Sequence, residues 1–162
     1  MIVYVDTSVL LRLALGEPHP LAAWAITERA MSSELVRVEA LRTVDRARIN
    51  HALADDVVAE RRAAILELID GLELVALDAA VLGRSAEPFP TALGTLDAIH
   101  LSSALLAREA YPELAFATHD RGLAIAAQAV GFQVPGAPGV NGPRAMRHRA
   151  PARRSRGTAG RR

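Results

Sequence analysis

The sequence contains no cysteine and no lysine, and only 4% of its 162 residues are aromatic. The lack of cysteine excludes disulfide bonds and thiolate metal sites. No apolar run reaches the roughly 18 residues that a membrane-spanning helix needs. The segment before Asp6 has no basic region, so it does not look like a signal peptide. Together these absences predict a cytoplasmic protein with no membrane partner.

Acidic residues are absent from the end of the chain. All eighteen lie at or before Asp120, whereas eight of the nineteen arginines lie after Pro143. The first 143 residues hold the other eleven arginines and carry a net charge of −7, and the rest carries +8. We expect one domain with a single core over residues 1–135. The Pro/Gly-rich and then Arg-rich tail over 136–162 has too few apolar side chains to fold, so we expect it to be disordered.

Within the domain, short apolar runs alternate with longer helical patterns, which is typical of α/β proteins with a parallel sheet. The runs that predict strands lie at 2–5, 30–32, 72–77, 114–118 and, as a short final strand, 132–134. The segments that predict helices are one capped by Thr7 or Ser8, then 21–30, 33–49, 54–69, a short helix capped by Asp78, 95–110 and 120–130. The expected sheet therefore has four or five strands.

Two of the predicted strands end abruptly in an acid. Asp6 directly follows the first strand, and Asp120 comes two residues after the strand at 114–118. Ligands of parallel α/β sheets sit beyond the C-terminal ends of the strands, so these carboxylates face each other if their strands are neighbours. Glu39 and Asp97 lie on helices that could border the same edge.

Each of these acids also has a purely structural interpretation. Asp6 and Asp120 can cap the helices that follow them. Asp97 lies in the first turn of its helix, where a carboxylate favours the helix dipole. Glu39 can pair with neighbours on a solvated helix face. Taken singly, each acid is weak evidence for a site.

Taken together, four short segments form a distinctive pattern. They are VYVDTS at 3–8, SELVRVEALR at 33–42, LDAIHL at 96–101 and ATHDRGL at 117–123. Their order and spacing, over residues 1 to about 134, resemble PIN domains, and the second segment is similar to the glutamate-bearing helix of VapC-type toxins. The resemblance implies an α/β/α sandwich around a central parallel sheet.

The resemblance also implies a toxin endoribonuclease that depends on Mg²⁺ or Mn²⁺. It makes Asp6, Glu39, Asp97 and Asp120 the metal-binding catalytic acids, and Ser8 and Thr118 the hydroxyls that orient them. The implied partners are an RNA substrate, a cognate antitoxin and a second copy in a homodimer. Clustered carboxylates suit this chemistry because they draw in a hard cation, which can activate a water to attack an RNA phosphate.

Rival phosphotransfer families lack a required part in this chain. Haloacid-dehalogenase phosphatases, response-regulator receivers and P-loop proteins all use a lysine, and the sequence has none. A non-catalytic PIN-like module that binds RNA or protein stays open as the alternative. The Arg-rich tail either adds salt-sensitive contacts to RNA phosphates or has no defined role.

The histidines receive no catalytic role. His100 lies one turn after Asp97 and could bond to it or to substrate, but a packed histidine is at least as common in such a place. His119 lies between Thr118 and Asp120 and would point away from both if the strand continues.

Overall fold

Strand β1 (Ile2–Val5) lies in the interior of a four-stranded parallel sheet in the computed structural model, which describes residues 1–17 and 22–135. The order is β3-β2-β1-β4, so β1 pairs with β2 on one side and with β4 on the other. The other strands are β2 (Arg29–Ser33), β3 (Glu73–Val75) and β4 (Ala115–Ala117). The chain leaves β1 toward β2 and later returns to β4 on the opposite side. The boundary between β1 and β4 is therefore the point where strand order reverses, which is where ligands bind in such sheets.

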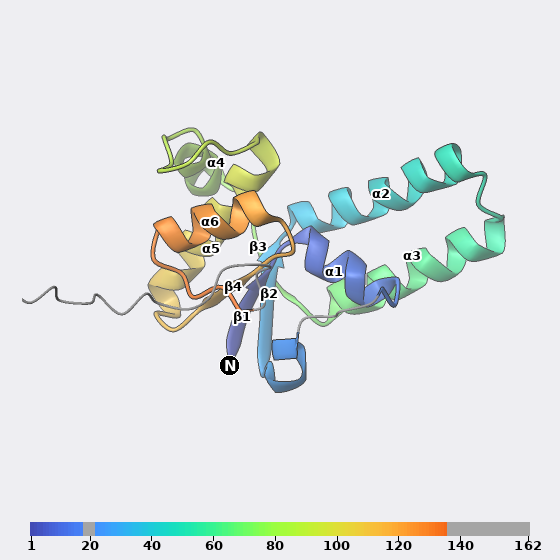
Figure 1. Cartoon of the computed structure of the whole chain (residues 1–162), viewed down its shortest axis with the longest axis horizontal. Helices are drawn as coiled ribbons and strands as arrows, with labels where there is room; N and C mark the ends of the chain where they lie inside the picture. Colours follow the sequence, from blue (N-terminus) through green and yellow to red (C-terminus); the bar gives the residue numbers. More distant parts are fainter. Residues whose placement is uncertain (18–21, 136–162) are drawn as a thin grey trace, which may run out of the picture.

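Helices cover both faces of the sheet (Figure 1). The helices on one side are α1 (Thr7–Ala14), α2 (Leu35–His51) and α3 (Asp55–Asp70). Those on the other side are α4 (Ala79–Ser85), α5 (Thr95–Ala110) and α6 (Arg121–Ala129). A short 3₁₀ helix, η1 (Ala22–Ile26), precedes β2. The expected α/β/α sandwich is confirmed.

The alternation of side chains along β1 explains how the two helical layers attach. Val3 and Val5 pack with Val9 of α1 on one face of the sheet. Tyr4 points to the other face, where it packs with Leu101 of α5 and Phe116 of β4. Successive residues of a strand face opposite sides, so one short apolar strand supplies both cores. All of these side chains are fully or almost fully buried.

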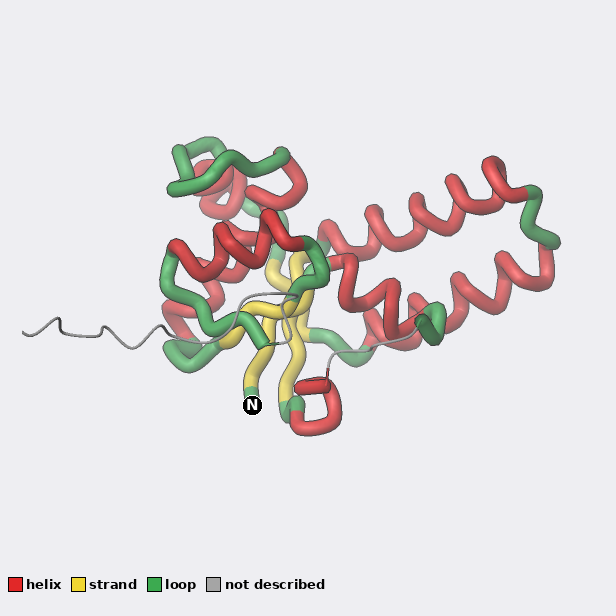
Figure 2. Tube along the Cα trace, in the orientation of Figure 1, coloured by secondary structure: helices red, strands yellow, loops and turns green. Residues whose placement is uncertain are grey.

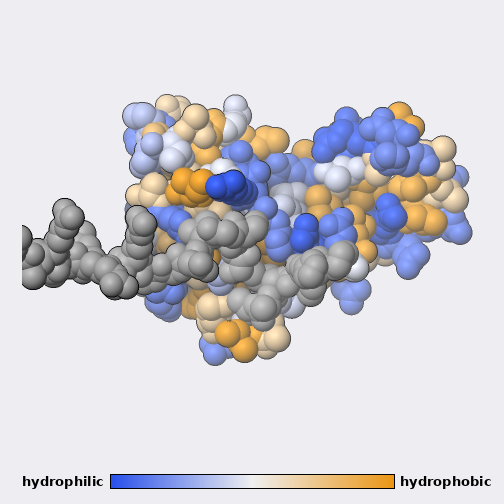
Figure 3. Space-filling model, viewed as in Figure 1, coloured by the Kyte–Doolittle hydropathy of each residue, from blue (hydrophilic) through white to orange (hydrophobic). Residues whose placement is uncertain are grey.

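Helices α2 and α3 form a long hairpin that extends away from the sheet (Figure 2). A third cluster of apolar side chains, including Val44 of α2 and Ile65 of α3, joins the two helices to Leu10 of α1. Polar and apolar residues both reach the surface of this hairpin (Figure 3), and the exposed apolar side chains include Val38 and Ile49 of α2. The base of the hairpin is thus held by α1, which directly follows Asp6.

Three of the sequence predictions are wrong in detail. Residues 132–134 form no strand, although the backbone N–H of Phe116 donates to the carbonyl of Gln133 (2.9 Å). Of the helix expected over 21–30, the described residues form only the 3₁₀ helix η1, and β2 already begins at Arg29. Thr7 and Ser8 do not cap helix α1; Asp6 does, as its structural interpretation allowed.

The remaining strands and helices lie where the sequence predicts them, within a few residues at each end. Within residues 1–17 and 22–135, no helix is long and apolar enough to cross a membrane. The predicted tail over 136–162 lies outside the described residues.

Candidate functional site

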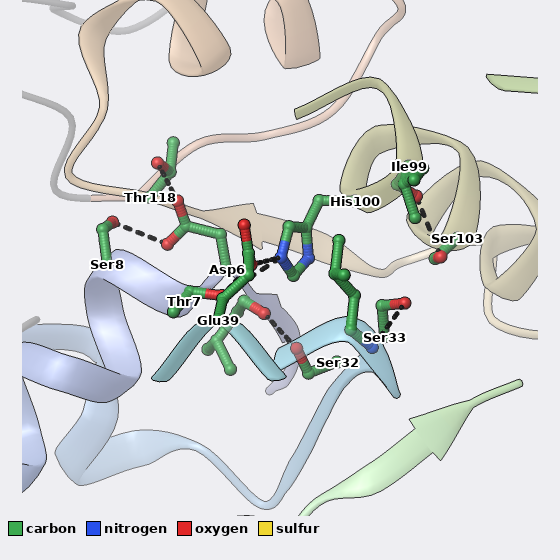
Figure 4. A network of polar contacts seen from close by, with 12 residues as sticks. Asp6, Thr7, Ser8, Ser32, Ser33, Glu39, Ile99, His100, Ser103 and Thr118 are labelled. Carbon is green, nitrogen blue, oxygen red and sulfur yellow. Dashed lines mark hydrogen bonds and ion pairs between the residues drawn. The ribbon is translucent and has the colours of Figure 1, made fainter. Parts of the chain in front are cut away.

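The carboxylate of Asp6 is buried at the end of β1, with only 4% of the residue exposed. Its Oδ1 accepts hydrogen bonds from the hydroxyl of Ser8 (2.7 Å) and the backbone N–H of Val9 (3.1 Å). Its Oδ2 accepts one from the hydroxyl of Thr118 (2.7 Å), as Figure 4 shows. Burial raises the pKa of Asp6 above its ordinary value, and these hydrogen bonds oppose that rise only in part.

The ends of β1 and β4 are joined by further bonds around the same hydroxyls. The Thr118 hydroxyl accepts the backbone N–H of Asp120 (2.9 Å), and the Ser8 hydroxyl accepts that of His119 (2.9 Å). Oδ1 of Asp120 then accepts the N–H of Leu123 (2.7 Å) and caps α6. The expectation that the two strands are neighbours is confirmed, and their terminal acids share Thr118 as a common partner.

Asp97 lies in the first turn of α5. The other three acids affect the pKa of its carboxyl. Burial raises the pKa of Asp97, and the negative charges of Asp120, Asp6 and Glu39 raise it further. Like charges influence one another in this way only at short range, so Asp97 lies within electrostatic range of the other three acids predicted from the sequence.

Glu39 projects from α2 toward the same region, where two donors share one of its oxygens. Oε2 accepts hydrogen bonds from the hydroxyl of Thr7 and from Nε2 of His100 (2.7 Å). Burial alone would raise the pKa of Glu39, but the bonds from His100 and Thr7 outweigh it and lower the pKa. The structural alternative of a pair on a solvated helix face is wrong for Glu39, since its partners come from α1 and α5.

His100 is the residue whose place in the site the sequence did not predict. The residue is 2% exposed, and its Nδ1 lies 3.0 Å from the hydroxyl of Tyr4. The two rings meet edge to face, with centroids 6.1 Å apart. Two signals were present: His100 lies one helical turn after Asp97, and Tyr4 places a hydroxyl in an otherwise aliphatic strand, where it needs a partner.

His119 contacts the site through its backbone. Its backbone N–H bonds to Ser8, but Nε2 is buried and has no hydrogen-bond partner in the part of the chain that the structure describes.

Comparison with known proteins decides the family. The sequence profile of the PIN domain matches residues 3–128. Ribonuclease VapC47 of Mycobacterium tuberculosis (strain CDC 1551 / Oshkosh) is 34% identical over 145 residues, which cover 85% of this chain and 98% of that protein. The chain belongs to the PIN-domain family. The resemblance drawn from four short motifs is thereby confirmed.

Membership in the PIN family implies a divalent metal, and the side chains at this edge have the chemistry to hold one. All the candidate ligands are carboxylate oxygens, which hard cations such as Mg²⁺ prefer. Among the described residues, however, no three acidic or histidine side chains converge tightly enough to form a ready-made ion site. Mg²⁺ usually keeps several waters and contacts only one or two carboxylates directly, so a looser arrangement of acids fits it.

Proposed function

We propose that the chain is a divalent-metal-dependent endoribonuclease and the toxin of a toxin–antitoxin pair. The observation that carries this proposal is the meeting of Asp6 and Asp120 at the β1/β4 boundary, within electrostatic range of Asp97. The likeness to Ribonuclease VapC47 over most of both chains supports RNA as the substrate.

Among residues 1–17 and 22–135, each proposed metal ligand keeps an acceptor site that no donor occupies. An ionised carboxylate has about four lone-pair sites, and three donors bond to Asp6. Asp120 uses Oδ1 to cap α6 and Glu39 uses Oε2 for Thr7 and His100, which leaves Oδ2 and Oε1. Asp97 completes the catalytic set, and Ser8 and Thr118 orient Asp6. A bound Mg²⁺ or Mn²⁺ would activate a water toward the phosphorus and offset charge on the phosphate.

The same charges explain why activity should require the metal. Four carboxylates at one edge repel an RNA phosphate, and their mutual repulsion raises the pKa of Asp97. A divalent cation relieves both effects at once. Without it, the site should neither hold RNA at this edge nor cleave it.

Cleavage of RNA with Mg²⁺, with Mn²⁺ and with a chelator tests the proposal. The Asp6→Asn variant should lose cleavage by roughly 100-fold or more, beyond the 10–100-fold that outer partners of a metal site give. Asp78→Asn is the matched control, because Asp78 caps α4 as Asp6 caps α1, with Oδ1 accepting the Val81 N–H (2.9 Å). Cleavage that persists in chelator would contradict the metal mechanism. RNA binding without cleavage in any metal would favour the non-catalytic module.

The proposed partners are a cognate antitoxin that blocks the site and a second copy in a homodimer. Expression together with the product of the adjacent gene should yield a complex without ribonuclease activity. Size-exclusion chromatography of the chain alone should give twice the monomer mass. A monomer that no neighbouring gene product accompanies would contradict both partner proposals. Sequencing of RNA ends after controlled expression, with Asp6→Asn as control, would identify the RNA.

A further inference from the structure

A chain of buried polar contacts runs from β1 through α5 to α2. The Tyr4 hydroxyl lies 3.0 Å from Nδ1 of His100, and Nε2 of His100 lies 2.7 Å from Oε2 of Glu39. Tyr4 is completely buried and His100 almost completely. These contacts join residues 96 and 61 positions apart in sequence, so the fold, not local helix geometry, builds them.

The Tyr4 hydroxyl and the Glu39 carboxylate set the direction of the two hydrogen bonds to the His100 ring. An ionised carboxylate can only accept, so the proton between His100 and Glu39 belongs to Nε2. The Tyr4 hydroxyl carries a proton at neutral pH, and it lies close enough to Nδ1 to donate that proton to it. The tyrosine thus selects the ring form that points an N–H at the glutamate.

The described residues donate hydrogen bonds to only one oxygen of the Glu39 carboxylate. Thr7 and His100 both bond to Oε2, and the Thr7 hydroxyl also lies 3.2 Å from Nε2 of His100. No described group hydrogen-bonds to Oε1. When one oxygen of a carboxylate is fixed in this way, the other oxygen remains able to coordinate a metal ion.

We propose that His100 is a positioning residue, held by Tyr4 with its proton on Nε2, which fixes Glu39 so that Oε1 is presented to the metal. This inference rests on the proposed nuclease function. It assigns His100 no contact with RNA, and its effect passes entirely through Glu39. A partner of this kind typically changes metal affinity or activity by about 10–100-fold when it is removed.

Cleavage kinetics at varied Mg²⁺ test the role of His100. His100→Leu should lower kcat or the apparent Mg²⁺ affinity by about 10–100-fold while KM for RNA stays within about twofold. His100→Gln keeps a donor for Glu39 and should recover most of the loss. Tyr4→Phe should fall between them, since the ring remains but its proton is no longer fixed. His51→Leu and His51→Gln, at the exposed C-terminal end of α2, are the matched controls and should match the wild type.

Nitrogen NMR of the His100 ring in the full-length wild type gives a readout that does not depend on activity. We expect a proton on Nε2 and none on Nδ1, and a proton found on Nδ1 would overturn the proposal. Wild-type cleavage together with an unimpaired His100→Leu variant would also overturn it, while leaving the nuclease function intact. If the wild type cleaves no RNA in any metal, the proposed function fails, and the NMR result still decides whether Tyr4 fixes the ring.

Discussion

The hydroxyl of Thr118 donates a 2.7 Å hydrogen bond to Oδ2 of Asp6, across 112 positions of sequence. The same oxygen of Thr118 accepts the backbone N–H of Asp120 (2.9 Å). One buried hydroxyl therefore sets the position of the two acids that end β1 and β4. Its loss should affect the fold and the site together.

Replacing Thr118 by valine keeps the shape of the side chain but removes this hydroxyl. The buried Asp6 carboxylate then lacks a donor, and we expect a loss of about 1–3 kcal/mol in the free energy of unfolding. Cleavage should fall by about 10–100-fold, because Asp6 and Asp120 lose their common partner. Urea unfolding and RNA cleavage measure the two effects. Thr118→Ser is the control and should stay near the wild type, whereas a fully stable Thr118→Val would contradict the importance of this bond.

Asp97→Asn should separate stability from activity. The folded-state pKa of Asp97 is raised by burial and by the other acids, so its ionisation destabilises the fold as the pH rises through that pKa. In chelator at neutral pH the variant should melt at a higher temperature than the wild type. The difference should shrink as the pH falls toward the ordinary value of 3.8.

Mg²⁺ should raise the melting temperature of the wild type more than that of the Asp97→Asn variant, because it binds the wild type more tightly. Cleavage by the variant should be lost. Thermal melts across pH, with and without Mg²⁺, give the measurement. Full cleavage by Asp97→Asn would remove Asp97 from the proposed ligands, and identical melting at every pH would show that the acids do not repel one another there.

The sequence predicted the sheet and the positions of Asp6 and Asp120 at its edge because those features depend on local pattern. An apolar run that ends in an acid marks the end of a parallel strand, and this placed Asp6 and Asp120 at the correct edge. The final strand predicted at 132–134, which the structure does not form, is different in kind. Only one backbone bond, from Phe116 to Gln133, joins it to β4, and no pattern in a three-residue segment shows whether pairing will extend further.

The partners of Glu39 could not be predicted for a similar reason. A histidine one turn after Asp97 has the same local pattern whether it packs in the core or bonds to a carboxylate. The 2.7 Å contact between His100 and Glu39 depends on how α5 and α2 are placed relative to each other. The cap of α1 stayed open between Asp6 and Thr7 or Ser8, because all three are good capping residues, and the structure decides for Asp6.

Ser102 of α5 offers a substitution that should stabilise the protein. Its hydroxyl is completely buried and has no hydrogen-bond partner among the described residues. Ser102→Ala removes this unsatisfied group, and we expect a gain of about 1 kcal/mol in the free energy of unfolding with unchanged cleavage. Ser103→Ala is the contrasting variant, since the Ser103 hydroxyl donates to the carbonyl of Ile99 (2.9 Å) and its removal should give no gain. Destabilisation by Ser102→Ala, measured in urea, would mean that the hydroxyl has a partner after all.

Gly122 in the first turn of α6 leaves space for the carboxylate of Asp120. A Cβ at this position would lie 3.2 Å from Oδ1 of Asp120, which accepts the N–H of Leu123. Gly122→Ala should therefore displace this carboxylate and lower cleavage, while alanine's helix propensity, about 1 kcal/mol better than that of glycine, keeps the fold stable. Gly83→Ala in α4 is the matched control, because its Cβ would meet nothing within 4 Å. It should gain similar stability without loss of cleavage. Equal activity of the two variants would show that the exact position of the Asp120 carboxylate does not matter for cleavage.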